Sequence, residues 1–433
     1  MKSKISRRRF ASTAMSAVAG ICIVPARVLG GTGRIAPSDK ITLGFIGNGR
    51  QSQGLAENFI RLDEVQLVAT SDIYRRKMEV FHDFVQTAYR QKTGNMNWTG
   101  LSMHDNYIDF INDSSIDGII IALPDHWHAL PSIQAANAGK HVYCEKPLSH
   151  TVMEGRAMVN AARANNIVFQ TGSMQRSSRI FRHACELVRN GYIGEVKRVN
   201  VSVGDPAVPC DLPAEQLVPG LDWYRWIGPA PARHFNSILA PPPEDGSWPM
   251  WRKYSEYGGG ILSDWGAHMY DIAQWALGMD DTGPVFLSPP STKGATRGLI
   301  MRYANGVELH HAEFGRGWGV EFHGAEGVLQ VSRGYLDTKP ESIAKVEIKS
   351  SEVQLYKSDD HYLDWIKAIG SGSRPICDVE IGHRSATLCN LANIAYSTRK
   401  DLDWDPVSEQ FTNDKGANKL LTKKYRAGFE VPV

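Results

Sequence analysis

The chain has 433 residues, of which 42% are hydrophobic and 22% charged, a composition typical of a folded globular protein and not of a disordered or fibrous one. Its length exceeds the size at which one hydrophobic core keeps growing, so we expect two domains after an N-terminal leader. The formal net charge of +2 becomes −4 without the six basic residues of that leader, since 42 Lys and Arg then face 46 Asp and Glu. This mildly acidic balance argues against nucleic-acid binding.

Residues 1–31 are expected to be an export signal and leader. The segment "SRRRF" resembles a twin-arginine signal with Arg7 and Arg8 as the pair, and the apolar stretch after it is shorter than the ~20 residues of a membrane-spanning helix. A disordered basic arm is the alternative. A signal would make the twin-arginine translocation machinery a partner and the mature chain periplasmic or otherwise extracytoplasmic, without stable membrane insertion. The scattered cysteines that remain predict no disulfide framework.

The first predicted element is a strand, turn and helix in "ITLGFIGNGRQSQGLAENFI", residues 41–60. Gly47 and Gly49 lie two apart in the turn, and Ser52 stands where a GxGxxG motif would have its third glycine. Small residues at such a turn let backbone N–H groups and the helix N-terminus approach a pyrophosphate. The turn is therefore a candidate dinucleotide site, although Ser52 departs from the full pattern.

A second strand, "VQLVATSD", ends at Asp72. A carboxylate at this position accepts the ribose hydroxyls of the adenosine, which favours NAD over NADP because it repels a 2′-phosphate. Arg75 and Arg76 follow closely and could instead hold such a phosphate, so NADP stays possible.

Two more buried strands lead into candidate site residues, the first into Pro124 and His128 in "ALPDHWH", the second into Glu145 and Lys146 in "HVYCEKP". Strands that alternate with helices predict an α/β fold with a doubly wound parallel sheet, whose ligands bind at the carboxyl ends of the strands. We therefore expect an NAD(P)-binding Rossmann domain over residues 38–172.

The rest of the chain predicts a second, α+β domain over residues 173–433. Residues 205–257 are irregular and rich in Pro and Trp, and a long irregular segment of this kind is more often functional than accidental. Alternating patterns predict strands, and the helical segments within 361–400 are expected to pack back on this domain. The predicted strands cover residues 297–303, 307–314, 318–323 and 327–331.

The segment "GGGILSDWGAHMYD", residues 258–271, places Asp264, His268 and Asp271 on one helical face. Three interpretations are open. These residue types bind divalent metals, but one helix rarely supplies a full set of ligands. Asp264 could cap the helix while His268 is buried in the core. Alternatively, His268 and Asp264 could form a proton-transfer pair.

The motifs "GFIGNG", "SDIYRR", "ALPDHWHA", "GKHVYCEKPLS" and "GGGILSDWGAH" occur in an order and at intervals that resemble the Gfo/Idh/MocA oxidoreductases, a family that includes glucose–fructose oxidoreductase and inositol dehydrogenase. The resemblance covers nearly the whole chain after residue 40. It implies a Rossmann domain followed by a domain with a large open, mostly antiparallel sheet. It also implies NAD(P) as cofactor and a sugar or polyol as substrate.

Carried over by motif, the family's catalytic residues correspond to Lys146, Asp264 and His268. We expect His268 to be the base, Asp264 to orient it and contact substrate, and Lys146 to polarise the reacting hydroxyl, although base and polariser could exchange roles. Asp271 is expected to be structural, and no metal is expected. The other candidates for the cofactor are Glu145, Pro124 and His128, with a solvated loop as the alternative for His128. The other candidates for the substrate are Arg176 and Trp251. Arg176 could equally lie on the surface, and Trp251 could stack on a sugar or only pack its loop.

An exported enzyme has no free pool of NAD to exchange with, so we expect a tightly held cofactor that is restored in each cycle. The main expectation is oxidation of a sugar, polyol or glycoside hydroxyl, including hydride transfer between two sugars. One alternative is a redox-neutral glycosidase that uses transient C3 oxidation and elimination, and another is a non-catalytic sugar sensor. A homo-oligomer is expected from the family resemblance.

Overall fold

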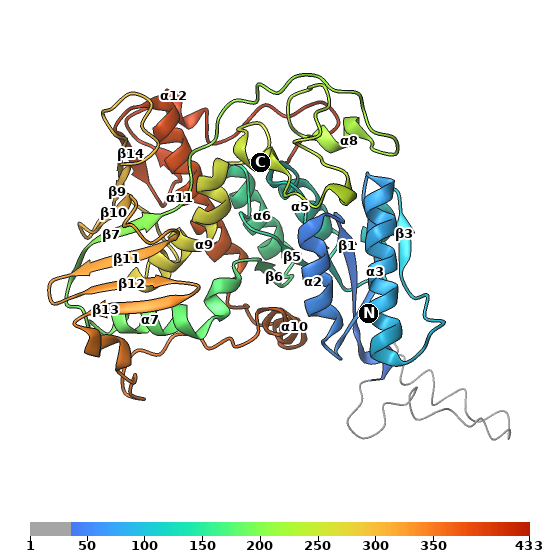
Figure 1. Ribbon diagram of the computed structural model, residues 1–433, viewed down its shortest axis with the longest axis horizontal. Coiled ribbons are helices and arrows are strands. Elements are labelled where there is room, and N and C mark those ends of the chain that lie inside the picture. Colours follow the sequence, from blue (N-terminus) through green and yellow to red (C-terminus); the bar gives the residue numbers. More distant parts are fainter. Residues whose placement is uncertain (1–35) are drawn as a thin grey trace, which may run out of the picture. The chain divides into compact units, whose positions relative to one another are not determined.

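The computed structural model describes residues 36–433, and the predicted twin-arginine signal lies outside the described residues. Residues 41–433 form one compact unit that contains two β-sheets (Figure 1). Within residues 36–433, each helix is either too short or too polar to cross a lipid bilayer.

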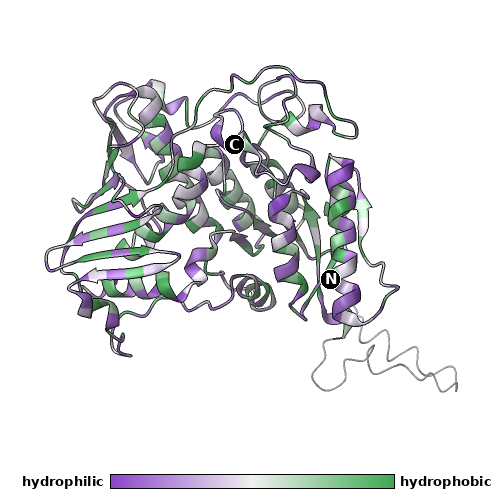
Figure 2. Cartoon of the chain, in the orientation of Figure 1, coloured by the Kyte–Doolittle hydropathy of each residue, from purple (hydrophilic) through white to green (hydrophobic). Residues whose placement is uncertain are grey.

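The first sheet has six parallel strands in the order β3-β2-β1-β4-β5-β6. This order confirms the predicted doubly wound sheet. The switch point, at which the strand order reverses, lies between β1 and β4. Figure 2 shows hydrophobic residues gathered along the strands, and all four residues of β4 are buried. The strands are β1 (Ile41–Ile46), β2 (Val65–Ser71), β3 (Ser102–His104), β4 (Gly118–Ile121), β5 (His141–Cys144) and β6 (Phe169–Thr171).

Helices connect these strands, as βαβ topology requires. Thr151 caps helix α6 with a capping box in which Glu154 is the reciprocal partner. The helices of this part of the chain are α2 (Arg50–Ile60), α3 (Arg75–Thr93), α4 (Ile108–Ile111), α5 (Ala129–Asn137) and α6 (Val152–Ala164).

The second sheet has nine strands and is mostly antiparallel, with only β7 and β10 pairing in parallel. The four strands predicted from alternation are present as β9 to β12, whereas β8, β13, β14 and β15 were not predicted. The strands are β7 (Val196–Ser202), β8 (Phe286–Ser288), β9 (Ile300–Arg302), β10 (Glu308–His311), β11 (Gly319–Gly324), β12 (Val328–Ser332), β13 (Tyr335–Lys339), β14 (Leu402–Asp405) and β15 (Gln410–Phe411).

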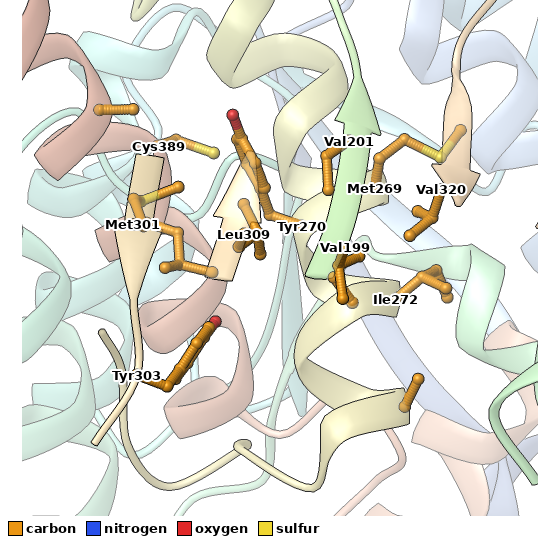
Figure 3. Close-up of a cluster of buried hydrophobic side chains, with 14 of the residues drawn as sticks. Val199, Val201, Met269, Tyr270, Ile272, Met301, Tyr303, Leu309, Val320 and Cys389 are labelled. Carbon is orange, nitrogen blue, oxygen red and sulfur yellow. The ribbon is translucent and has the colours of Figure 1, made fainter. Parts of the chain in front are cut away.

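Helix α9 (Gly260–Leu277) packs on this second sheet and carries the segment that contains Asp264 and His268. Its residues Met269 and Tyr270 face strand residues such as Val201 and Leu309 in a fully buried cluster (Figure 3). Because close packing resists displacement, this contact fixes the helix from which the site is built. Helix α7 (Arg179–Arg189) contributes to the same cluster.

The C-terminal helices were expected to pack back on the second domain, and they also contact the first. Helix α10 (His361–Ser371) packs on the first sheet, where the Trp365 ring lies 5.6 Å from Phe59 and 5.7 Å from Tyr143 between centroids. Helix α11 (Val379–Thr398) contacts both α6 and α9. Periodicity identifies an apolar helix face but not the sheet it will cover, which explains the error.

Residues 205–257 contain little regular structure, apart from α8 (Trp223–Ile227) and short 3-10 turns. This segment, called the insertion below, reaches the first sheet: Leu221 forms an antiparallel bridge with Tyr74, just beyond the end of β2. It also contains its own hydrophobic cluster, which includes Trp223, Trp226 and Tyr74.

Candidate functional site

A pocket of about 490 Å³ lies at the carboxyl ends of β1, β2, β4 and β5. One part of its wall comes from the first sheet, and the rest comes from the insertion, helix α9 and the loops at the edge of the second sheet. It is therefore placed where doubly wound sheets bind their ligands.

The turn after β1 has the features of a pyrophosphate cradle. Gly47 has φ +90°, and a Cβ there would lie 2.5 Å from the Ala122 carbonyl oxygen. Gly49 is the N-cap of α2, and a side chain on it would project into open space that a ligand can use. Ser52 is buried, and its hydroxyl donates to the Gly47 carbonyl at 2.7 Å. The serine thus stabilises the turn from the position where a third glycine would allow close packing of helix and strand.

The carboxylate of Asp72 is held at the end of β2. One oxygen accepts a hydrogen bond from the Asn48 N–H at 2.6 Å, and the other accepts from the Tyr74 N–H at 2.8 Å. Burial raises the pKa of Asp72, so a pair of hydroxyl donors is a favourable partner for it. Arg75 pairs with Glu79 and Asp105, and Arg76 pairs with Glu244. Both candidate phosphate ligands therefore have other partners, which favours NAD over NADP.

Replacing Asp72 with serine is expected to weaken NAD binding and to lower the NAD-to-NADP affinity ratio at least about tenfold, because it removes both the ribose acceptor and the charge that repels a 2′-phosphate. Titration of each variant with NADH and NADPH measures the ratio. Arg76→Ala is the matched control and is expected to change the ratio little, since Arg76 is held by Glu244 on the surface. An unchanged ratio in Asp72→Ser would contradict this role for Asp72.

The loop after β5 brings Glu145 and Lys146 into the pocket. Glu145 is buried, which raises its pKa, and it accepts from the Gln51 amide at 3.3 Å. The Lys146 ammonium lies 2.6 Å from Asp264 Oδ1 and 2.8 Å from the Asp264 backbone oxygen. Burial opposes ionisation of Asp264, but the nearby charges of Lys146 and Arg252 outweigh it and lower the pKa of this carboxyl. The pair is therefore an ammonium beside a carboxylate.

His268 lies one turn further along α9 and lines the same pocket. The residue is only 3% exposed, and its Nδ1 has no hydrogen-bond partner among the described residues. Burial, together with the charges of Lys146 and Arg333, lowers the pKa of His268 well below its usual value. The ring is therefore neutral near pH 7, the state that a general base requires.

Two details of α9 differ from expectation. The helix begins at Gly260, so Asp264 lies inside its first turns and does not cap it. Nor does the His268 ring donate to the Asp264 carboxylate in the described part of the chain; this carboxylate accepts from the Lys146 ammonium instead. Asp271 points away from the pocket to the Arg176 guanidinium at 2.8 Å, which agrees with its predicted structural role.

The other predicted residues are only partly brought together. Pro124 and Trp251 line the pocket, and the Arg252 guanidinium lies 4.3 Å above the Trp251 ring. His128 does not line it: its two ring nitrogens lie 2.8 Å from the backbone oxygens of Leu123 and Pro147, and the neutral ring donates to one of them.

Arg176 also lies away from the pocket, contrary to the expectation that it contacts substrate. It is 1% exposed and pairs with Asp271 and Asp280. Its guanidinium is therefore fully engaged within the protein core.

The sequence reasoning missed several pocket residues. Asp125 is buried, and burial together with Asp264 raises its pKa to about 8. Its only sequence signal is its place at a strand end, between Pro124 and His126. Arg252 contacts Asp264 at 3.5 Å from the insertion, where no motif marks it. Trp265, Trp318 and Arg333 line the outer end of the pocket.

Residues 36–433 contain no cluster of three or more His, Cys, Asp or Glu side chains arranged to hold a metal ion. The polar groups of the pocket instead suit an organic cofactor with a hydroxylated substrate. The nucleotide end offers the glycine turn and Asp72, and the other end offers Lys146 and His268.

Two family models match this chain and show the family to which it belongs. Residues 41–173 match the NAD-binding Rossmann fold of the Gfo/Idh/MocA oxidoreductases, and residues 208–431 match the C-terminal alpha/beta domain of the same family. The chain belongs to the Gfo/Idh/MocA oxidoreductase family. The resemblance inferred from the motifs is thereby confirmed, as are the NAD-binding domain and the fold class.

Individual relatives are distant. The chain is 23% identical to the oxidoreductase YrbE of Bacillus subtilis, over 82% of this chain and 93% of the relative. It is also 23% identical to myo-inositol 2-dehydrogenase of Thermotoga maritima, over 83% of this chain and 96% of the relative. Among solved structures, aldose-aldose oxidoreductase from Caulobacter crescentus aligns with a TM-score of 0.57 at 17% identity, covering 84% of this chain and 99% of that one. The last likeness is one of fold.

Proposed function

We propose that this chain is an exported, NAD-dependent oxidoreductase that oxidises a hydroxyl group of a sugar, polyol or glycoside and holds its cofactor tightly. The observation that carries the proposal is the meeting of Lys146, Asp264 and His268 in the pocket of a family Rossmann domain. The names of the relatives support the substrate class, since one acts on myo-inositol and another on aldoses.

The residues of the pocket suit proton removal from an alcohol. The neutral imidazole of His268 takes the hydroxyl proton, and the Lys146 ammonium donates toward the same oxygen and stabilises the negative charge that develops there. Asp264 fixes the position of the ammonium through the 2.6 Å contact. NAD, when bound between the glycine turn and Asp72, supplies the hydride acceptor. Lys146 is thus the polariser, and His268 is the base.

The insertion supports the tightly held cofactor. The Gly220 oxygen accepts from the Arg75 N–H at 3.0 Å, and the Asp222 N–H donates to the Ile73 oxygen at 3.0 Å, so the insertion is anchored by main-chain bonds beside Asp72. Trp248 lines the pocket, with the guanidinium of Arg50 at 4.9 Å and that of Arg252 at 5.2 Å from its ring. A nucleotide bound there is covered by a segment that must move before release.

Export is the other part of the proposal, and it rests on the arginine pair in "SRRRF". Twin-arginine translocation carries folded proteins, so a cofactor bound in the cytoplasm can travel inside the protein. The mature enzyme then works in the periplasm or otherwise outside the cytoplasm. It regenerates NAD without releasing it, for example by hydride transfer to a second sugar. Self-association into a homo-oligomer belongs to the same proposal.

The proposal is tested on purified protein. Denaturation is expected to release NAD that survived gel filtration, and adding sugars or polyols is expected to produce NADH absorbance. If the protein retains NAD and releases an aglycone without net NADH, the elimination route is supported in place of net oxidation. If it binds sugar without turnover, a sensor is indicated. A reporter fused behind residues 1–31 tests export, and Arg7→Lys together with Arg8→Lys is expected to keep it in the cytoplasm.

Trp248→Ala is expected to speed NADH release about tenfold, because two cation–π contacts worth about 0.5–1 kcal/mol each hold this side chain across the pocket. The rate is measured as loss of bound NADH fluorescence when excess NAD is added. Tyr224→Ala is the matched control, since Tyr224 is an exposed aromatic residue of the same insertion that packs near Phe429, away from the pocket lining. Equal release rates in the two variants would contradict a covering role for Trp248.

A further inference from the structure

The outer end of the pocket contains an arginine that the proposed chemistry does not use. Arg333 follows β12 in the turn that leads to β13, and it lines the pocket together with His268 and Asp264. No carboxylate of the described residues lies within 4 Å of its guanidinium, whereas Lys146 and Arg252 both contact Asp264. Arg333 is thus a cation at the substrate end without a counter-ion.

The side chain of Arg333 is nevertheless fixed in direction. Its Nε donates to the Gln175 side-chain oxygen at 2.9 Å, and its guanidinium lies 4.6 Å above the Trp265 ring. Because Nε is already used, the two terminal nitrogens remain to bind a partner. A guanidinium edge with two parallel N–H donors matches the two oxygens of a carboxylate.

The surroundings match a sugar ring beside that edge. The Trp265 ring lies 4.2 Å from Trp318 and 5.7 Å from His268 between centroids. Trp318 is 40% exposed and lines the pocket. Aromatic faces accept the apolar faces of pyranose rings, so the wall offers a platform for the ring, a base for its hydroxyl and a cation for an anionic substituent.

The charges of this end favour an anion. Lys146, Arg252 and Arg333 line it, while Asp264 pairs with the first two, and burial raises the pKa of Asp125, which also lines the pocket, to about 8. Burial lowers the pKa of Arg333 and the charge of Asp264 opposes this; a bound carboxylate would supply the missing opposite charge. A neutral sugar would leave the terminal nitrogens to water.

We propose that Arg333 selects substrates that carry a carboxylate, so that the sugar oxidised by this enzyme is a uronate or a uronic-acid glycoside. The inference rests on the proposed function and names the substrate class of the same site. The carboxylate is bound by the terminal nitrogens of Arg333 while the hydroxyl to be oxidised faces His268 and Lys146.

The experiment compares matched pairs of probes: the methyl glycosides of glucuronate and glucose, and those of galacturonate and galactose. Substrate loss and NADH formation give kcat/KM for each, and the ratio of acidic to neutral probe is the readout, so that differences in the amount of folded enzyme cancel. The ratio is expected to exceed about 10 in the wild-type enzyme, the discrimination expected of one charge-assisted hydrogen-bonded pair. In Arg333→Gln it is expected to fall about tenfold or more, and in Arg333→Lys to take an intermediate value, because a lysine keeps the charge but not the paired donors.

Arg316→Gln is the matched control. Arg316 is a nearby arginine that pairs with Asp337 and stacks on Tyr335, and it does not line the pocket; its variant should keep the wild-type ratio. Neutral probes oxidised as well as or better than acidic ones, or an equal loss on both in Arg333→Gln, would overturn the inference and leave the proposed function intact. If no probe of either kind is consumed although NAD is bound, the proposed function itself fails.

Discussion

Replacing His268 with glutamine is expected to lower kcat/KM for sugar oxidation by about 10²–10⁴-fold while the variant still binds NAD, the range for loss of a general base. The imidazole lines the pocket with its Nδ1 unpaired, and burial keeps it neutral. Glutamine fills similar space but cannot take a proton. Single-turnover rates at which sugar reduces the bound NAD, with cofactor content measured on the same samples, separate lost chemistry from lost binding.

His361→Gln is the matched control for this experiment. His361 is also buried and near enough for its charge to affect His268, and burial lowers its pKa to about 3, but it does not line the pocket. Its variant is expected to retain kcat/KM within a few-fold. Wild-type activity in His268→Gln would assign the base elsewhere, with Asp125 as the next candidate because its pKa is raised to about 8.

The pH profile gives an independent check on His268. A general base must be unprotonated, so kcat/KM falls as the pH drops through its pKa. Because the pKa of His268 is lowered, this acidic limb is expected below pH ~6.5, the value of an unperturbed histidine. The limb is expected to disappear from the residual activity of His268→Gln. A limb well above that pH would contradict a buried neutral histidine as base.

Local patterns predicted the cofactor half of the site well. The turn with Gly47 and Gly49, the strand that ends at Asp72, and the helix that carries His268 are each encoded by residues adjacent in sequence. Their local geometry follows from glycine conformation and from strand and helix periodicity. The position of the glycine turn relative to Asp72 then follows from the rule that parallel strands present their carboxyl ends at one edge, whereas this rule does not place the helix of His268, which packs on the second sheet.

The parts that were missed depend on contacts between distant residues. Arg176 finds its partners 95 and 104 residues away, at Asp271 and Asp280, and Arg333 is held by Gln175, 158 residues away. Neither pairing leaves a periodic trace in the sequence. The family resemblance therefore placed Arg176 at the substrate, and no motif pointed to Arg333. The fold gives Arg176 two carboxylate partners, whereas Arg333 has only the Gln175 amide and the Trp265 ring as partners among the described residues.

The buried group around Arg176 should contribute strongly to stability. The guanidinium contacts Asp271 at 2.8 Å and Asp280 at 2.7 Å, and Ser385 donates to Asp271 at 2.7 Å. Removing one member of a buried ion pair leaves the other charge without compensation, which costs about 3–5 kcal/mol. Arg176→Met is therefore expected to lower the unfolding temperature markedly, whereas Arg179→Met, three residues further on and exposed, is expected to change it little.

The loss of unfolding free energy in Arg176→Met, relative to wild type, should depend on pH in a defined direction. Burial already raises the pKa of Asp271, and loss of the arginine raises it further because the guanidinium charge opposes that shift. Above pH ~3.8, the ordinary value in the unfolded chain, the folded variant binds more protons than the unfolded one, so its stability falls as pH rises toward the raised pKa. The deficit relative to wild type is expected to be larger at about pH 8 than at about pH 5 by up to ~1.4 kcal/mol per unit over that range. Thermal unfolding at both pH values measures it.

The same samples, assayed at low temperature, are expected to keep the wild-type KM for sugar. A selective rise in KM without loss of stability would place Arg176 at the substrate after all.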